Sequence, residues 1–217
     1  MSGIKAIFWD NDGVLVDTEH LYFQATKTVL ASAGVPLTRE QYIDLFLRQG
    51  RGAWHLAEEA GVPPSDVDRL RDERDVLYSR LLSEGAHAID GVESLLADLH
   101  GRVIMGIVTS SKRDHFDLIH RRTGLLRYVD FVVASGDYAR AKPHPDPYLK
   151  AIAIAGVGAE TCMAVEDSER GLQAALAAGL RCMVVPTDLT RECAFVGAAA
   201  VMTTIADVGR ALDRCRP

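Results

Sequence analysis

The chain has 217 residues, of which 48% are hydrophobic and 25% are charged. This composition is ordinary for a globular protein and supplies enough apolar material for a core, so broad disorder is excluded. The 24 Lys and Arg residues against 30 Asp and Glu residues leave a formal net charge of −6. An acidic surface repels nucleic acid and anionic lipid, so neither is an expected partner, and an anionic substrate would need cations supplied by its own site.

Localisation and redox state are also constrained by the sequence. No apolar run approaches the roughly 18 residues that a membrane span needs, and the N-terminus leads directly into an acidic cluster, unlike a secretory signal. The four cysteines form no CxxC pair, which favours free thiols over a disulfide framework; they are Cys162, Cys182, Cys193 and Cys215. We therefore expect a cytoplasmic protein with no membrane contact, and a monomer as the default oligomeric state.

Short apolar runs alternate with helical patterns along most of the chain. Nearly continuous apolar runs suit parallel strands covered on both faces, and helices between them predict a doubly wound α/β sheet, that is, a Rossmann-like core. The predicted strands are residues 4–9, 103–108, 131–134, 162–165 and 182–185. In open parallel sheets ligands bind beyond the carboxyl ends of the strands, so the residues after each run are the candidates for a site.

Residues 18–85 break this alternation, because they contain helical periodicity but no good strand. One helix is predicted to open with a capping residue in the segment Ser65–Asp68 and to present one apolar stripe, formed by Val67, Leu70, Leu77 and Leu81. The pattern predicts an α-helical cap at residues 17–88, inserted into an α/β core made of residues 1–16 and 89–217. Two chain crossings form a hinge, so we expect the cap to close over the site as a lid, with a rigid helical embellishment as the alternative.

The first predicted strand ends in Asp10-Asn11-Asp12-Gly13. Carboxylates two residues apart point to the same side of an extended chain, and they repel each other unless a cation lies between them. Mg²⁺ prefers carboxylate, carbonyl and water oxygens, although an Asx-type turn with solvated acids would also explain the pattern. Asn11 is expected to point the opposite way and to need hydrogen-bond partners if it is buried.

Three further strand ends carry groups of the same chemistry. The hydroxyls of Thr109, Ser110 and Ser111 follow the second strand, where they could hold phosphate oxygens or simply cap a helix. Lys142 lies after the third strand, and the prolines that follow it stiffen its loop, so it is presented as a point charge suited to phosphate.

The fourth strand end is Glu166-Asp167-Ser168, in which Ser168 is expected to cap a helix over residues 169–178 that Gly179 ends. An acid pair, a hydroxyl, a lysine and a second acid pair are thus predicted to meet in one crevice. These are the groups that phosphoryl transfer requires.

Taken together, these motifs resemble the haloacid dehalogenase-like superfamily, in its branch of β-phosphoglucomutase-like and phosphoglycolate-phosphatase-like proteins with a helical cap. The resemblance covers nearly the whole chain and is carried by residues 10–19, Thr109-Ser110, Lys142-Pro143, Glu166-Asp167-Ser168 and residues 171–179. Asn11 departs from the pattern, because the family usually has a hydrophobic residue at this position.

The resemblance implies a role for each motif. Asp10 would be the nucleophile that forms an aspartyl phosphate, and Asp12 would protonate the leaving alcohol and then activate water. Ser110 and Lys142 would hold the transferring phosphoryl group, with Thr109 and Ser111 beside them. Mg²⁺ would be bound by Asp10, the backbone carbonyl of Asp12, and Asp167, with Glu166 acting directly or through water.

The cap would then select a small phosphorylated substrate. Arg51, in the turn at residues 49–52, is the first candidate to hold a distal phosphate or carboxylate, with Arg48 as a weaker one and a solvated loop as the alternative reading. The leading prediction is a Mg²⁺-dependent phosphatase for a sugar phosphate or similar metabolite, and a sugar phosphomutase is the alternative. The presence of Asp12 disfavours a dehalogenase, and a phospho-acceptor signalling domain would need neither the extra length nor a cap.

Overall fold

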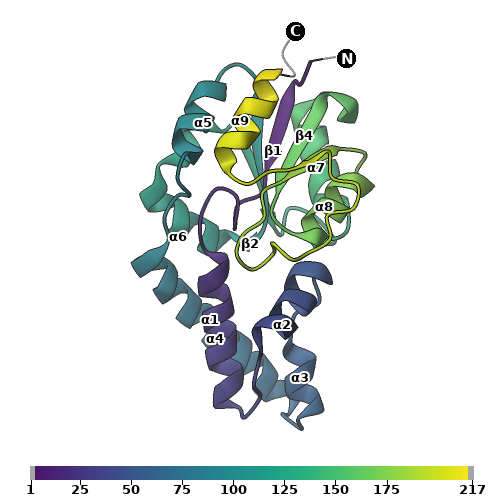
Figure 1. Cartoon of the computed structure of the whole chain (residues 1–217). Helices are drawn as coiled ribbons and strands as arrows, with labels where there is room; N and C mark the ends of the chain where they lie inside the picture. The colour runs from purple at the N-terminus through teal and green to yellow at the C-terminus, as the bar shows by residue number, and fades with distance from the viewer. Residues whose placement is uncertain (1–2, 215–217) are drawn as a thin grey trace.

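In the computed structural model, which describes residues 3–214 and the side chains of residues 3–212, six parallel strands form one sheet in the order β3-β2-β1-β4-β5-β6 (Figure 1). The strands are β1 (Ala6–Trp9), β2 (Ile104–Lys112), β3 (Phe131–Ser135), β4 (Cys162–Glu166), β5 (Arg181–Val184) and β6 (Ala200–Val201). The order is that of a doubly wound fold, so the predicted fold class is confirmed. The short edge strand β6 was not predicted.

Helices cover both faces of the sheet. The helices α5 (Val92–Leu99), α6 (Arg113–Thr123) and α9 (Ile205–Arg214) lie on one face, and α7 (Asp146–Ala155) and α8 (Glu169–Ala177) lie on the other (Figure 1). Single-turn 3-10 helices precede β3 and β4, at Leu125–Tyr128 and Ala159–Thr161. In β1 alternate side chains serve the two faces, since Ile7 and Trp9 join the first cluster, whereas Ala6 and Phe8 join the second. A strand buried on both sides must be apolar throughout, which explains its continuous hydrophobic run.

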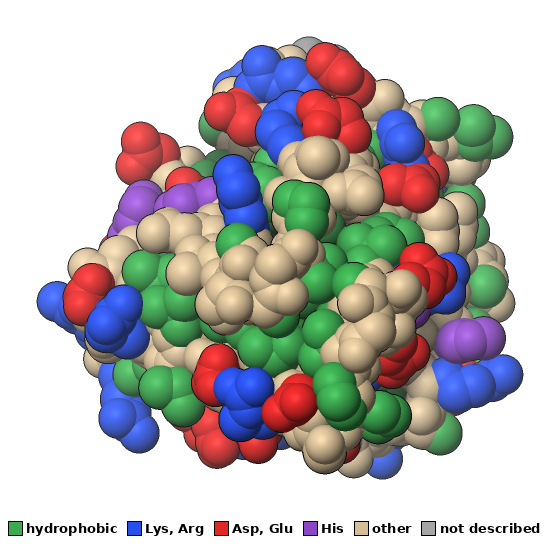
Figure 2. All heavy atoms as spheres, turned by 90° about the horizontal axis from the view of Figure 1, so that it is seen from below, with side chains coloured by type: hydrophobic (Ala, Val, Ile, Leu, Met, Phe, Trp, Pro, Cys, Tyr) green, Lys and Arg blue, Asp and Glu red, His purple; other side chains and the backbone are tan. Residues whose placement is uncertain are grey.

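Residues 19–85, named the helical cap from here on, lie below the carboxyl ends of the strands (Figure 1). The cap contains α1 (Glu19–Ser32), α2 (Arg39–Tyr42), a π-helical turn (Ile43–Arg48), α3 (Trp54–Glu59) and α4 (Pro64–Gly85). It has a hydrophobic cluster of its own, which includes Leu30, Tyr42, Phe46, Leu47 and Val67. Seen from the cap end (Figure 2), charged side chains of both signs are interspersed around the rim of the molecule.

The two chain crossings between core and cap run side by side. Val16 forms an antiparallel bridge with Ala88, and the amide of Ile89 donates to the carbonyl of Leu15 at 3.0 Å. The predicted hinge therefore consists of two paired segments of extended chain. Opening of the cap about these segments remains a prediction.

One prediction about α4 was wrong. The helix α4 starts at Pro64 after Pro63, without a side-chain cap from the segment Ser65–Asp68, because proline at the first helical turn needs no amide partner. The apolar stripe predicted along α4 is present, since Val67 and Leu70 are buried and Leu77 and Leu81 pack half-buried against the core cluster. Ser168 caps α8 as predicted, accepting a hydrogen bond from the amide of Gly171.

The described cysteines form no disulfide, as predicted. Cys162, Cys182 and Cys193 are free thiols, and Cys215 lies outside the described residues. Among residues 3–214 no helix combines the length and the hydrophobicity that crossing a membrane requires.

The cap turn at Gly50 packs directly on the loop that carries Lys142. Gly50 has a φ of +66°, and a methyl group added there would lie 2.8 Å from the Lys142 carbonyl oxygen. We expect Gly50→Ala to displace this loop and, for the phosphatase reaction that the sequence predicts, to lower kcat/KM at least about tenfold, because small misplacements of catalytic groups have large effects on rate. Steady-state kinetics of phosphate release would measure the change.

Gly34→Ala is the matched control for this variant, since Gly34 has a φ of +76° with no atom close to an added methyl group. Both variants should be destabilised by the backbone strain of about 1–3 kcal/mol. Only Gly50→Ala should also lose activity, and equal activity of the two variants would show that this contact does not position Lys142.

Candidate active site

Asp10 lies one residue beyond the end of β1, in the middle of the sheet. Its amide donates to the carbonyl of Val165 at 2.9 Å, which continues the register of β1 with β4. Lys142, from the loop after β3, donates from Nζ to Asp10 Oδ1 at 2.7 Å and to Glu166 Oε1 at 2.6 Å. Three segments that are far apart in the sequence therefore meet around one buried ammonium group.

The two carboxylates that pair with Lys142 also form an acidic cluster with Asp167. Asp10, Glu166 and Asp167 each place a carboxylate oxygen within 4.8 Å of the others. Glu166 Oε2 and Asp167 Oδ2 are buried and have no hydrogen-bond partner among the described residues. Burial raises the pKa of Asp10 to about 7, although Lys142 opposes the change, and burial also raises the pKa of Asp167 well above its usual value.

These acids fit a magnesium site, because buried carboxylates with unsatisfied oxygens need a cation and Mg²⁺ takes oxygen ligands. Two glycines allow the carboxylates to sit so close to the backbone. Added side chains at Gly13 and Gly171 would overlap Asp167 and Glu166, respectively. The glycine that follows Asp12 in the sequence is therefore needed for its small size as well as for its φ of +86°.

The carboxylate of Asp12 is not part of this acidic group. It accepts hydrogen bonds from the hydroxyls of Thr18, Ser111 and Thr109, the last two at 2.7 and 3.3 Å. Asp12 is thus held between the end of β2 and the hinge, and its predicted metal contact is limited to the backbone carbonyl. Thr109, Ser110 and Ser111 lie within β2, which extends to Lys112, and not after the strand as predicted.

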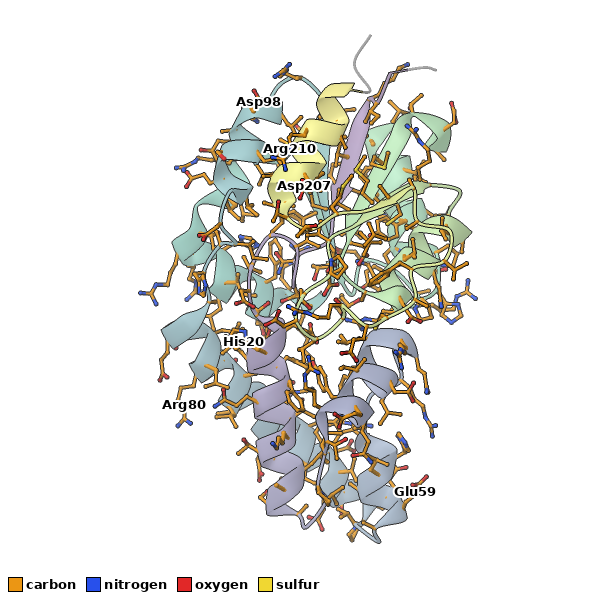
Figure 3. The ribbon with its side chains drawn as sticks, viewed as in Figure 1. His20, Glu59, Arg80, Asp98, Asp207 and Arg210 are labelled. Carbon is orange, nitrogen blue, oxygen red and sulfur yellow. The ribbon has the colours of Figure 1, made fainter. Side chains whose placement is uncertain are left out.

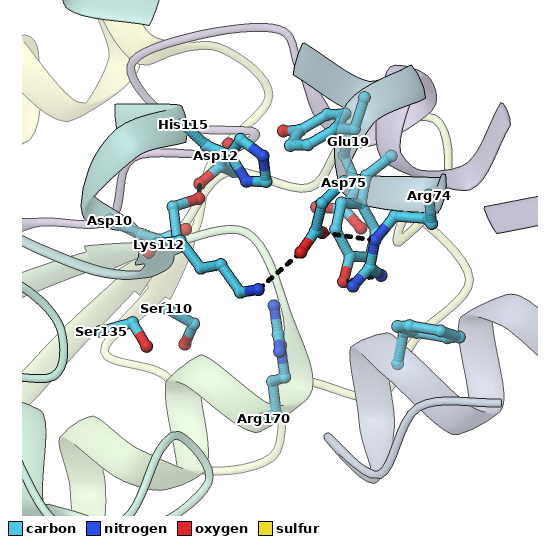
Figure 4. Close-up of a pocket in the computed structure, with 14 residues that line it drawn as sticks. Asp10, Asp12, Glu19, Arg74, Asp75, Ser110, Lys112, His115, Ser135 and Arg170 are labelled. Atoms are coloured by element: carbon cyan, nitrogen blue, oxygen red, sulfur yellow. Dashed lines mark hydrogen bonds and ion pairs between the residues drawn. The ribbon is translucent and has the colours of Figure 1, made fainter. Parts of the chain in front are cut away.

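A cavity of about 220 Å³ lies between the core and the helical cap (Figure 4). From the core it is lined by Asp10, Asp12, Ser110, Ser111, Lys112, His115, Ser135 and Arg170; from the cap it is lined by Glu19, Tyr22, Phe46, Arg74, Asp75 and Tyr78. Thr109 and Ser111 donate to Asp12, which leaves Ser110 as the predicted phosphate ligand at the cavity wall.

Three cationic residues of this cavity were not predicted, namely Lys112, Arg74 and Arg170. Asp75 bridges two of them across the junction, accepting from Lys112 Nζ at 2.5 Å and from Arg74 Nε at 2.8 Å (Figure 4). The position of Lys112 directly after the hydroxyl triplet is a signal that sequence reasoning could have used. Arg74 also carried a signal, because it lies four residues from Leu70 and from Tyr78, so that a charged residue interrupts the buried face of α4.

The predicted cap residues lie elsewhere. Arg51 is exposed and is not among the residues that line the cavity, and Arg48 forms an ion pair with Glu169 of the core at 3.3 Å. His20, which was not predicted to bind substrate, is at the start of α1 and pairs with Asp17 at the surface (Figure 3). A substrate role for Arg51 therefore remains a prediction that this geometry does not support.

The acidic group leads to a prediction about metal and pH. Because the folded-state pKa values of Asp10 and Asp167 are raised, these carboxylates bind protons more readily in the folded than in the unfolded protein. The free energy of unfolding of the metal-free protein should then fall as pH rises from about 4 to about 7, by on the order of 3 kcal/mol. We expect Mg²⁺ to stabilise the protein more at pH 8 than at pH 5, measured by urea unfolding in EDTA and in Mg²⁺.

Asp167→Asn tests the origin of that effect. Removing one buried carboxylate should raise the stability in EDTA at pH 8 and should abolish most of the response to Mg²⁺. If Mg²⁺ stabilised wild type equally at both pH values, the acids would not be the cause.

Comparison with known proteins agrees with this arrangement. The sequence profile described as haloacid dehalogenase-like hydrolase matches residues 7–185. Protein CbbY of Cereibacter sphaeroides is 34% identical, over 95% of this chain and 94% of its own length. The phosphorylated carbohydrates phosphatase of Thermotoga maritima is 30% identical, over 82% of each chain.

A solved structure of CbbY is also similar to this chain in its fold. The D10N mutant of CbbY from Rhodobacter sphaeroides, in complex with xylulose-(1,5)bisphosphate, superposes with a TM-score of 0.80 at 27% identity, over 95% of this chain and 96% of that one. The chain therefore belongs to the haloacid dehalogenase-like hydrolase family.

Proposed function

We propose that this protein is a Mg²⁺-dependent phosphatase that hydrolyses a small phosphorylated sugar through an aspartyl phosphate on Asp10. The observation that carries the proposal is the position of Asp10, which lines the cavity, pairs with Lys142 and places a carboxylate oxygen within 4.8 Å of those of Glu166 and Asp167. A carboxylate with a fixed cation on one side and a substrate cavity on the other is placed for attack on phosphorus.

The first step is transfer of the phosphoryl group to the protein. An Asp10 oxygen forms a bond to phosphorus as the bond from phosphorus to the ester oxygen breaks, and Asp12 donates its proton to the leaving alcohol. Lys142 fixes the orientation of Asp10 and offsets the charge that gathers around phosphorus. When held by Asp10, Asp167 and the backbone carbonyl of Asp12, with Glu166 directly or through water, Mg²⁺ would supply further neutralisation of that charge.

The second step releases phosphate. The Asp12 carboxylate takes a proton from water, the water oxygen bonds to phosphorus, and the bond between phosphorus and Asp10 breaks. The donors to Asp12 from Ser111 and Thr18 hold this side chain at the edge of the cavity, where it can act in both steps.

The preference for a sugar phosphate is supported by the relatives and by the cavity. Curated relatives include the carbohydrate phosphatase of Thermotoga maritima and a fructose-1-phosphate phosphatase of Escherichia coli, which is 30% identical. The cavity is small and has polar side chains of both charges on its walls, which suits a substrate with several hydroxyl groups.

A screen for phosphate release in Mg²⁺ tests this function. The panel should contain pentose and hexose monophosphates and bisphosphates, phosphoglycolate and nucleotides. We expect the highest kcat/KM for a sugar phosphate, and no release from any sugar phosphate would contradict the proposal.

Phosphomutase activity is the alternative, because the resemblance implies the same core residues for both activities. Incubation with β-glucose 1-phosphate separates the two: a mutase yields glucose 6-phosphate, whereas a phosphatase yields free phosphate. The first product without the second would replace the proposed hydrolysis.

A further inference from the structure

Asn11, the residue that departs from the family pattern, lies at one end of a buried chain of hydrogen bonds. It is fully buried between the two acids of the first motif. Its Nδ2 donates to Asp12 Oδ2 at 3.3 Å, and its Oδ1 is 2.8 Å from Nε2 of His120, a buried residue of α6. On the other side of the imidazole, Nδ1 is 2.8 Å from the hydroxyl of Thr123.

The direction of each hydrogen bond in this chain can be assigned. Burial lowers the pKa of His120 to about 4, although Asp12 and Asp117 oppose the change, so the imidazole is neutral near pH 7. The amide oxygen of Asn11 can only accept, so His120 carries its proton on Nε2 and donates it there. Nδ1 is then an acceptor for the hydroxyl of Thr123. With its oxygen occupied by His120, the Asn11 amide must direct its NH₂ group toward Asp12.

We propose that His120 and Thr123 are positioning residues, which hold the Asn11 carboxamide so that it keeps the Asp12 carboxylate in place for proton transfer. The proposal rests on the function proposed above, because it concerns the acid–base step at Asp12. Thr18, one donor to Asp12, belongs to the hinge, whereas the donors Asn11, Thr109 and Ser111 belong to the core, and of these Asn11 is the one that His120 holds. The Asn11 contact therefore holds Asp12 independently of the position of the cap.

A purely structural role is the competing explanation, since a buried amide and a buried imidazole must be paired in any case. The two explanations differ in which reactions they affect. A structural defect would slow all substrates to a similar extent, whereas a misplaced Asp12 slows transfer to Asp10 only when the leaving group needs a proton.

Two probes of similar shape separate these cases. Phenyl phosphate has a basic leaving group that needs a proton, whereas p-nitrophenyl phosphate releases a stabilised anion that does not. For both, kcat/KM reports the steps up to phosphoryl transfer to Asp10. We expect His120→Leu to lower kcat/KM about tenfold for phenyl phosphate, a part of the roughly 10²–10⁴-fold effect of general acid catalysis, and less than about twofold for p-nitrophenyl phosphate.

Conservative variants serve as controls. In His120→Gln the amide nitrogen can replace Nε2 as the donor, so kcat/KM for phenyl phosphate should return to within about threefold of wild type. Thr123→Val should lower kcat/KM less than His120→Leu does, with the same dependence on the leaving group. Thr123→Ser keeps the hydroxyl, so its kcat/KM for phenyl phosphate should match that of wild type. The two Thr123 variants leave His120 in place, so they decide the question even if His120→Leu does not fold.

Two results would overturn this inference. One is an equal loss for both probes in the folded variants, and the other is no loss for either probe. These failures differ from failure of the proposed function, in which wild type itself would release phosphate neither from any sugar phosphate nor from the two probes.

Discussion

Replacing Asp10 with Asn is expected to reduce phosphate release from p-nitrophenyl phosphate by at least about 10³-fold, since loss of a covalent nucleophile removes most of the catalysis. In wild type the ammonium group of Lys142 donates to Asp10 Oδ1 at 2.7 Å. The amide of Asn has nearly the shape of the carboxylate, and its oxygen can accept the same hydrogen bond. The loss should therefore appear in kcat and not in the amount of folded protein. Phosphate release and circular dichroism would measure the two quantities.

Asp114→Asn is the matched control, because Asp114 is an exposed carboxylate at the start of α6. It should turn over the substrate like wild type. Mass spectrometry of acid-quenched wild type should show the phosphoryl group on the peptide that contains Asp10. Turnover by Asp10→Asn at the wild-type rate would exclude the covalent mechanism.

Replacing Lys142 with Met is expected to have the largest effect on stability. Lys142 is 3% exposed. Its ammonium group lies 2.6–2.8 Å from Glu166 Oε1, Asp10 Oδ1 and the Val108 carbonyl oxygen. Removing one partner of a buried ion pair leaves the other uncompensated, which costs about 3–5 kcal/mol. Urea unfolding at pH 8 in EDTA would measure this loss without the offset that a bound cation provides.

The pH dependence of this variant gives a second check. Without Lys142 the neighbouring carboxylates can take up protons as the pH falls, so the loss of stability should be smaller at pH 5 than at pH 8. Lys150→Met, at an exposed position of α7, is the control and should change stability little. A loss below about 1 kcal/mol for Lys142→Met would mean that the buried acids do not depend on this ammonium group. Phosphate release should fall at least about 10²-fold, as for other preorganised charges around a transition state.

The central part of the candidate site could be predicted because it depends on topology. Parallel strands end on the same edge of the sheet, so Asp10 and Glu166 lie side by side there, and the loop that follows β3 brings Lys142 to the same edge. The capping role of Ser168 was also predictable, because it depends on residues adjacent in the sequence. The start of α4 was mispredicted because a proline and a serine both suit a helix N-terminus.

The cationic walls of the cavity depend on how two units dock. Arg74 and Asp75 face Lys112 only because α4 crosses the ends of the strands, and a pattern along α4 does not contain that crossing. The Asn11 amide and His120 are likewise 109 residues apart. The unusual residue type at position 11 was visible in the sequence, but its hydrogen-bond partner His120 was not.

By itself, the sequence determined the parallel sheet, the inserted helical segment and the acids, hydroxyls and lysine at the strand ends, because hydrophobic periodicity and short-range spacing decide these features. Only the tertiary structure decided that Ser111 and Thr18 hold Asp12, that Lys112, Arg74 and Arg170 line the cavity and that Arg51 does not. The reason is physical: the direction of a long side chain depends on packing between elements that are distant in the chain, and neither composition nor periodicity records that packing.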